Sequence, residues 1–160
     1  MGAPGASIAL ATLPNLRDAG GWTTADGRRV RTGVLFRSTA LDRLDPADSD
    51  ALTALGIRCV VDFRTATERT NQPDRTPSGA REQVEDILAE SQIAAPAQMQ
   101  AFFGDPSQAV AFLSSGRVDD AMRSAYREFI TLPSARSGFG AFYRLLLDDA
   151  DLPLAQAQAA

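Results

Sequence analysis

The chain has 160 residues, 44% of them hydrophobic, and a formal net charge of −4; at this length it can bury roughly 70% of its unfolded surface, enough for one globular domain. All 16 basic residues are Arg and alternate with acidic residues instead of forming a basic stripe, which disfavours nucleic-acid binding. One Cys and no His exclude disulfide scaffolds, zinc sites with ordinary ligands and triads that need an imidazole base, so we expect no metal and no cofactor.

The N-terminus lacks the charged region that opens a signal peptide, and no window reaches the roughly 18 apolar residues that a membrane span needs. We therefore expect a cytoplasmic protein without a membrane span, and secretion by another route is not excluded. Further along, Asp26-Gly27 predicts the two-residue turn of a β-hairpin, because both positions tolerate positive φ. Residues 28–31 would form the returning strand.

The next three elements indicate an α/β domain with a parallel sheet. Residues 34–38 are apolar on consecutive positions, which is typical of a strand covered on both faces. A helix follows, with Asp45 as its cap, Pro46 in its first turn and Gly56 as its stop. Residues 57–63 then predict a second buried strand, and strand, helix, strand at this spacing is a βαβ unit.

The middle of the chain carries weaker patterns. Residues 71–79 are rich in Pro and polar side chains and predict a loop. Residues 82–115 show helical pattern in pieces, interrupted by Pro and Gly, which indicates several short amphipathic helices. We interpret residues 80–118 as a helical insertion that forms a lid, with ordinary helices packed on the sheet as the alternative.

Two helices with apolar stripes are predicted next, the first capped by Asp119 and the second following Pro133. Both stripes are expected to belong to the core, although Tyr126 and Phe129 could line a pocket beneath a lid. Residues 151–154 resemble the entry to a further strand. The Ala- and Gln-rich residues 155–160 predict a low-complexity tail that is neither strand-like nor capped.

Several short motifs stand in a fixed order: Asn15-Leu16-Arg17-Asp18, residues 33–38, Leu55-Gly56-Ile57, and Asp62-Phe63-Arg64-Thr65 with Glu68. Together they resemble the bacterial protein tyrosine phosphatases of the B type, which are lid-bearing members of the cysteine-phosphatase superfamily. The likeness runs from about Leu13 to Pro77 and resumes more weakly from Met122 to Pro153. It implies a three-layer fold and hydrolysis of phosphotyrosine, or of phosphoserine, phosphothreonine or phosphoinositides, through a Cys-phosphate intermediate.

The resemblance also implies a His-Cys-x5-Arg loop directly after the segment that matches residues 152–154. In such a loop backbone N–H groups lower the pKa of the attacking thiol, and the Arg clamps the phosphate oxygens. The sequence lacks this loop. We therefore expect residues 1–160 to be a single, truncated and inactive phosphatase-like domain. Since the strand leading to the loop is central in the family, we also expect marginal stability or aggregation.

Cys59 is not expected to replace the missing nucleophile. Val60 and Val61 mark its surroundings as a buried strand, whereas a phosphate cradle needs a loop with free N–H groups. We predict an inert core residue whose thiol pKa is raised by burial.

Three residues at the ends of the predicted strands are candidates for the site, because ligands bind at the carboxyl ends of parallel strands. By the resemblance, Asp62 is the candidate general acid that protonates a leaving phenolate. Pairing with Arg64 or capping a turn would explain Asp62 equally well. Arg37 and Arg64 are candidate substrate-binding residues, and ion pairs with Asp18, Asp62 or Glu68 are the alternative.

A second functional hypothesis is a non-catalytic module, or pseudophosphatase, that binds phosphorylated partners through Arg37 and Arg64. A third is a rhodanese-like sulfur carrier, which needs a loop thiol and is disfavoured by the position of Cys59. The sequence does not indicate an oligomeric state.

Overall fold

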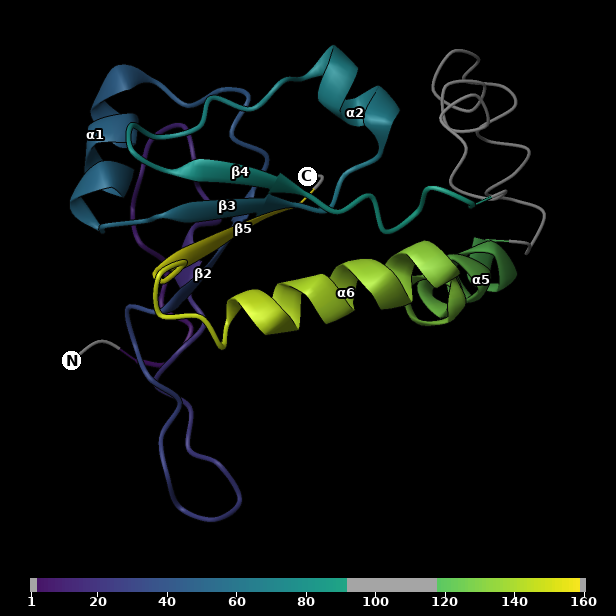
Figure 1. The fold of residues 1–160 in the computed structure, drawn as a ribbon, viewed down its shortest axis with the longest axis horizontal. Coiled ribbons are helices and arrows are strands. Elements are labelled where there is room, and N and C mark those ends of the chain that lie inside the picture. Colours follow the sequence, from purple (N-terminus) through teal and green to yellow (C-terminus); the bar gives the residue numbers. More distant parts are fainter. Residues whose placement is uncertain (1–2, 92–117, 159–160) are drawn as a thin grey trace.

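A computed structural model describes residues 3–91 and 118–158 of the chain (Figure 1). Its elements, in chain order, are β1 (Arg17–Asp18), β2 (Leu35–Thr39), α1 (Pro46–Ala54), β3 (Cys59–Asp62), α2 (Ala66–Asn71), β4 (Arg81–Val84), α5 (Val118–Thr131), α6 (Pro133–Leu145) and β5 (Leu154–Gln158).

The strands form one sheet in the order β1-β2-β5-β3-β4. β2, β5, β3 and β4 are parallel, and only β1 is antiparallel to its neighbour. Two hydrophobic clusters lie on opposite faces of the sheet, one beneath α1 and the other beneath α6. Figure 1 shows the resulting layers, with α1 and α2 above the sheet and α6 along its other side. The predicted three-layer α/β architecture is confirmed.

The strand β5 corrects the interpretation of the C-terminal residues. Residues 155–158 are not a tail without strand character, because they belong to the central strand, between β2 and β3. Their alternation of Ala and Gln is the period of two of a strand, with Ala155 and Ala157 buried on the face that α1 covers. The central strand whose absence was expected is therefore present, and the argument for marginal stability loses its premise.

The helix α1 forms as predicted. The Asp45 side chain caps it by accepting a hydrogen bond from the Asp48 amide at 2.8 Å, and Pro46 occupies the first turn. Gly56 ends the helix with a φ of 74°, a left-handed value that glycine adopts without strain.

Two elements of the middle region differ from the predictions. The helix α2 occupies residues 66–71, which overlap the start of the predicted loop, and it is fixed by a capping box between Thr65 and Glu68. Residues 81–84 form the edge strand β4 and not the beginning of a helix. An edge strand can keep polar side chains, so it lacks the apolar run that marks a central strand. Residues 92–117 of the predicted lid lie outside the described residues.

The helices α5 and α6 lie where they were predicted, but their apolar stripes are only partly buried. Phe142 of α6 packs against the sheet, whereas Tyr126 and Ile130 of α5 are 63% and 73% exposed. Asp119 lies inside the first turn of α5 and does not precede it. That Tyr126 and Phe129 line a pocket stays a prediction.

The hairpin before β2 also differs in detail. Thr24 bonds to Gly27 and Arg28 through its backbone, so the loop has three residues, and only Gly27 has a positive φ. A turn followed by a left-handed Gly is the usual three-residue hairpin loop. Among the described residues, no helix is long and apolar enough to cross a membrane.

Candidate active site

Asp62 ends β3 at the carboxyl edge of the sheet. It pairs in register with Ala157 of the central strand on one side and with Val84 of β4 on the other. Its side chain is fully buried. A carboxylate in this position needs compensating donors, because an unpaired buried charge is strongly unfavourable.

Arg64 supplies those donors. Its Nε lies 3.0 Å from Oδ1 and 3.1 Å from Oδ2 of Asp62, and its Nη2 lies 2.7 Å from Oδ2. The Arg64 backbone amide also donates to Oδ1 at 2.9 Å. The contact is a buried, bidentate ion pair, the strongest arrangement that these two side chains can form.

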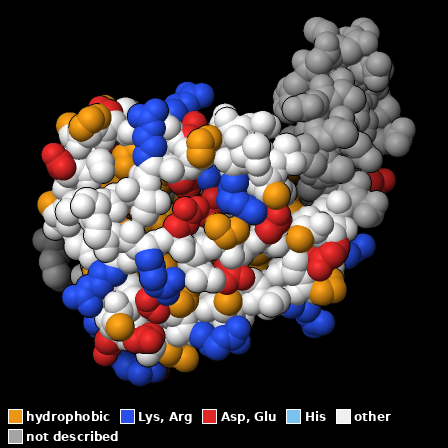
Figure 2. All heavy atoms as spheres, turned by 45° about the horizontal axis from the view of Figure 1, so that its top comes forward, with side chains coloured by type: hydrophobic (Ala, Val, Ile, Leu, Met, Phe, Trp, Pro, Cys, Tyr) orange, Lys and Arg blue, Asp and Glu red, His pale blue; other side chains and the backbone are white. Residues whose placement is uncertain are grey.

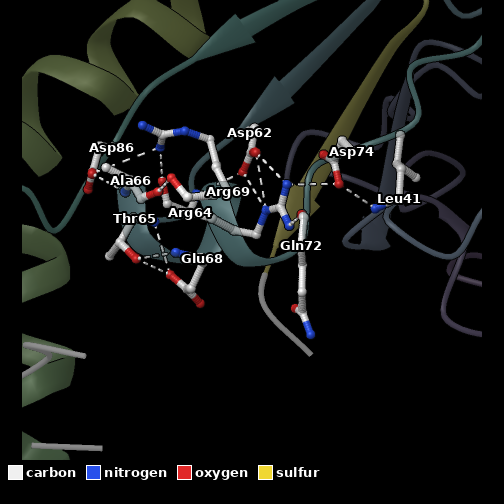
Figure 3. Close-up of polar contacts among 11 residues, drawn as sticks. Leu41, Asp62, Arg64, Thr65, Ala66, Glu68, Arg69, Gln72, Asp74 and Asp86 are labelled. Atoms are coloured by element: carbon white, nitrogen blue, oxygen red, sulfur yellow. Dashed lines mark hydrogen bonds and ion pairs between the residues drawn. The ribbon is translucent and has the colours of Figure 1, made fainter. Parts of the chain in front are cut away.

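The rest of the Arg64 guanidinium binds the loop that follows α2. Nη1 donates to the Gln72 carbonyl at 2.8 Å, and Nη2 lies 2.8 Å from Oδ1 of Asp74. Figure 3 shows the guanidinium between the carboxylates of Asp62 and Asp74. All three guanidinium nitrogens of Arg64 therefore contact protein acceptors, and its side chain is 2% exposed.

Asp74 is held less completely than Asp62. Its Oδ1 accepts a hydrogen bond from the Leu41 amide at 2.7 Å in addition to the contact with Arg64. Its Oδ2 is buried and has no hydrogen-bond partner in the described part of the chain. Burial, reinforced by the charges of Asp62 and Glu82, outweighs the Leu41 amide and Arg64 and raises the pKa of Asp74 to about 6.

The helix α2 is anchored to the same edge. Ala66 donates its amide to Asp86 at 3.0 Å, and Arg69 forms an ion pair with Asp86 at 3.9 Å. Arg69 also donates to the Arg64 carbonyl. These contacts fix the segment that carries Arg64 from the side opposite Asp74 (Figure 3).

The structure does not bring Arg37 together with Asp62 and Arg64. Arg37 is exposed on β2, where it lies opposite Arg17 and Gln156. Side chains alternate along a strand, so Arg37 shares the sheet face of Leu35 and Val61, whereas Asp62 shares the face of Val60. The two candidate substrate-binding arginines are thus on different faces.

Asp18 anchors the start of the hairpin. Its carboxylate accepts hydrogen bonds from Gly20 at 2.8 Å and Gly33 at 2.7 Å, and so closes the base of the hairpin.

Cys59 lies at the amino end of β3, about 10 Å from Asp62 by the rise of three strand residues. It is fully buried between β5 and β4. Burial raises the pKa of its thiol, partly opposed by Arg81. The prediction of a protected core cysteine with a raised pKa is confirmed.

Asp62, Asp74 and Glu82 each place a carboxylate oxygen within 4.8 Å of the others, a spacing that can suit a metal ion. Asp62, however, already accepts four hydrogen bonds from Arg64, and the guanidinium lies beside these groups. This donor set fits an arginine and not an added cation. Figure 2, in which the side of the molecule that carries α1 and α2 is turned forward, shows acidic and Arg side chains interspersed over that side.

Sequence reasoning found Asp62 and Arg64 but missed Asp74 and the backbone groups of Leu41 and Gln72. Asp74 sits in a segment of loop composition, where an isolated Asp carries no signal of burial. Only the path of the loop across the sheet edge brings it to Arg64.

Comparison with known proteins gives a consistent result. The sequence matches the tyrosine phosphatase family over residues 8–157. It is 42% identical over 74 residues to a protein of Cupriavidus necator named as a candidate tyrosine-protein phosphatase, and 41% identical over 76 residues to the triple specificity protein phosphatase PtpB of Mycobacterium tuberculosis. The alignments cover 46% and 45% of this chain and, in both cases, 26% of the relative.

Proposed function

Since the chain belongs to the tyrosine phosphatase family, we propose that the protein it represents hydrolyses phosphoric monoesters, with phosphotyrosine as the first substrate. Phosphoserine, phosphothreonine and phosphoinositides are the further substrates to test. The observation that carries the proposal is the match to the family over nearly the whole chain. The buried acid at the carboxyl edge beside the central strand supports it, since ligands of parallel sheets bind at this edge.

In this proposal the 160 residues alone do not turn over substrate. Phosphoryl transfer to sulfur needs an accessible thiolate that is surrounded by backbone N–H groups. The one Cys of the sequence is buried within a strand, where its pKa is raised.

The candidate residues have distinct proposed roles. Asp62 is the general acid of the complete site, and Arg64 holds it in place. Arg64 is engaged by Asp62, Asp74 and Gln72, so its proposed role is limited to holding Asp62. Arg37 lies on the opposite face of the sheet from Asp62, so its role as a substrate-binding residue stays a prediction that the proposed acid site does not use.

Hydrolysis of para-nitrophenyl phosphate tests the proposal. We would compare the 160-residue chain with a version extended by the downstream reading frame, each with its Cys59→Ser variant. Activity is expected from the extended chain only, and Cys59→Ser should not reduce it. Turnover by the 160 residues that disappears in Cys59→Ser would contradict the proposed roles.

The alternative, a non-catalytic module for phosphorylated partners, has less support, because Arg64 is already engaged by Asp62, Asp74 and Gln72. Calorimetric titration with a phosphotyrosine peptide separates the two. Heat of binding without hydrolysis by the extended chain would favour the alternative. The cytoplasmic location stays a prediction.

A further inference from the structure

Two buried carboxylates compete for one guanidinium at the carboxyl edge of the sheet. Arg64 contacts Asp62 through Nε and Nη2, and the same Nη2 contacts Asp74. Glu82 of β4 places a third carboxylate within 4.8 Å, and Glu68 of α2 also acts on Arg64 electrostatically. If all the carboxyls of this cluster are ionised, the negative charges outnumber the single positive one.

The competition is unequal. Both oxygens of Asp62 are satisfied by donors from Arg64, whereas Oδ2 of Asp74 is buried and has no donor among residues 3–91 and 118–158. A buried, unpartnered carboxylate oxygen is costly as an anion but can carry a proton. Burial and the neighbouring charge of Asp62 both favour the protonated form of Asp74. At pH values below about 6, Asp74 therefore carries a proton in the arrangement observed.

We propose that Asp62 and Asp74 are alternative partners of Arg64 that hold one proton between them, and that Asp74 is the positioning residue that sets whether Asp62 is ionised. With Arg64 on Asp62, the proton stays on Asp74. When Arg64 pairs with Asp74 instead, the proton leaves Oδ2 of Asp74 and is taken up by Asp62. One proton, one carboxylate and one guanidinium are present before and after, so the charge of the cluster does not change.

The exchange matters for catalysis only if the proposed function is correct, and it then resolves a difficulty of that function. A general acid must carry a proton, yet both carboxylate oxygens of Asp62 are engaged by donors from Arg64. Asp74 supplies the proton from within the site. The sequence has no His, the side chain that usually provides such a group near neutral pH.

Carboxyl carbon NMR of the 160-residue chain between pH 4 and 8 tests the inference without any need for turnover. The Asp74 signal, assigned by its loss in Asp74→Asn, should titrate with a midpoint of about 6. In Asp62→Asn the competitor for Arg64 is removed, and the Asp74 midpoint should fall by about one pH unit or more.

Asp86→Asn is the matched control, since it removes one negative charge on the opposite side of Arg64. It should leave the Asp74 midpoint unchanged. A midpoint near the ordinary value of 3.8 in the parent, or one that Asp62→Asn does not lower more than Asp86→Asn does, would overturn the inference.

A second measurement covers the case in which Asp62→Asn does not fold. In the parent chain, the Nε signal of Arg64 should shift with the same midpoint as Asp74, because the guanidinium is shared. An Arg64 signal that is constant through this pH range refutes the exchange. Since neither measurement depends on hydrolysis, a failure of the phosphatase assay and a failure of the exchange can be told apart.

Discussion

Replacing Asp74 by Asn should remove the contribution of this carboxyl to the pH dependence of the free energy of unfolding. The ordinary pKa of this carboxyl is 3.8, and burial raises it to about 6 in the folded chain. The folded state therefore binds the proton more tightly than the unfolded state. The stability that this protonation contributes is complete below pH 3.8 and is lost as the pH rises through 6. A difference of about two pH units corresponds to about 3 kcal/mol.

Asn fits the same place at every pH. Its amide oxygen can accept the hydrogen bonds that Oδ1 of Asp74 accepts from Leu41 and Arg64, and its NH₂ group takes the place of the unpartnered Oδ2. We expect the free energy of unfolding of Asp74→Asn, relative to the parent, to increase by about 2.5 kcal/mol between pH 4 and pH 8, since pH 4 already lies slightly above the ordinary pKa of 3.8.

Urea unfolding followed by circular dichroism at pH values from 4 to 8 measures this difference. Most of the change should fall below pH 6.5. Asp50→Asn, at an exposed position of α1, removes the same charge without a buried partner and serves as the control. A difference between Asp74→Asn and the parent that is the same at all pH values, or that favours the parent at pH 8, would refute the reasoning.

Three further outcomes are expected. Arg64→Met leaves Asp62 and Asp74 without their shared cation. It should lower the free energy of unfolding at pH 7, measured by urea titration, by about 3 to 5 kcal/mol. No loss would mean that the ion pair is dispensable. Gly20→Ala should lower the melting temperature more than Gly27→Ala. A Cβ on Gly20 would lie 2.2 Å from the Arg31 carbonyl oxygen, whereas a Cβ on Gly27 would meet open space and only the left-handed φ opposes it. A larger loss in Gly27→Ala would contradict this. Cys59 should react with a thiol reagent such as Ellman's only after unfolding, and rapid reaction under native conditions would show that it is accessible.

Short-range sequence patterns were sufficient to predict the helices and strands whose ends are determined by their own residues. Asp45, Pro46 and Gly56 determine the ends of α1 through a cap, a restricted φ and a left-handed turn, none of which needs tertiary information. The strands β2 and β3 were predicted from their consecutive apolar residues. β3 is buried on both faces as expected, whereas β2 is not, because its Arg37 is exposed. Asp62 and Arg64 followed from the position of the strand end and from the family resemblance.

Elements that depend on their neighbours could not be predicted in this way. Apart from Leu154, the strand β5 consists of Ala and Gln, and these residues form a strand because they lie between β2 and β3. β4 is polar because it lies at the edge of the sheet. The role of Asp74 depends on a contact with Arg64, ten positions earlier, across a loop whose path the sequence does not encode in any local pattern.

The position of β5 has a consequence for the synthesis of the protein. β2 and β3 do not pair with each other, because residues 154–158 separate them. While a ribosome is still making the chain, the sheet exists only as two disconnected ribbons, β1 with β2 and β3 with β4, whose inner edges are open. β2 and β3 can therefore join into one sheet only after residues 154–158 have been synthesised, and their facing edges stay unpaired until then.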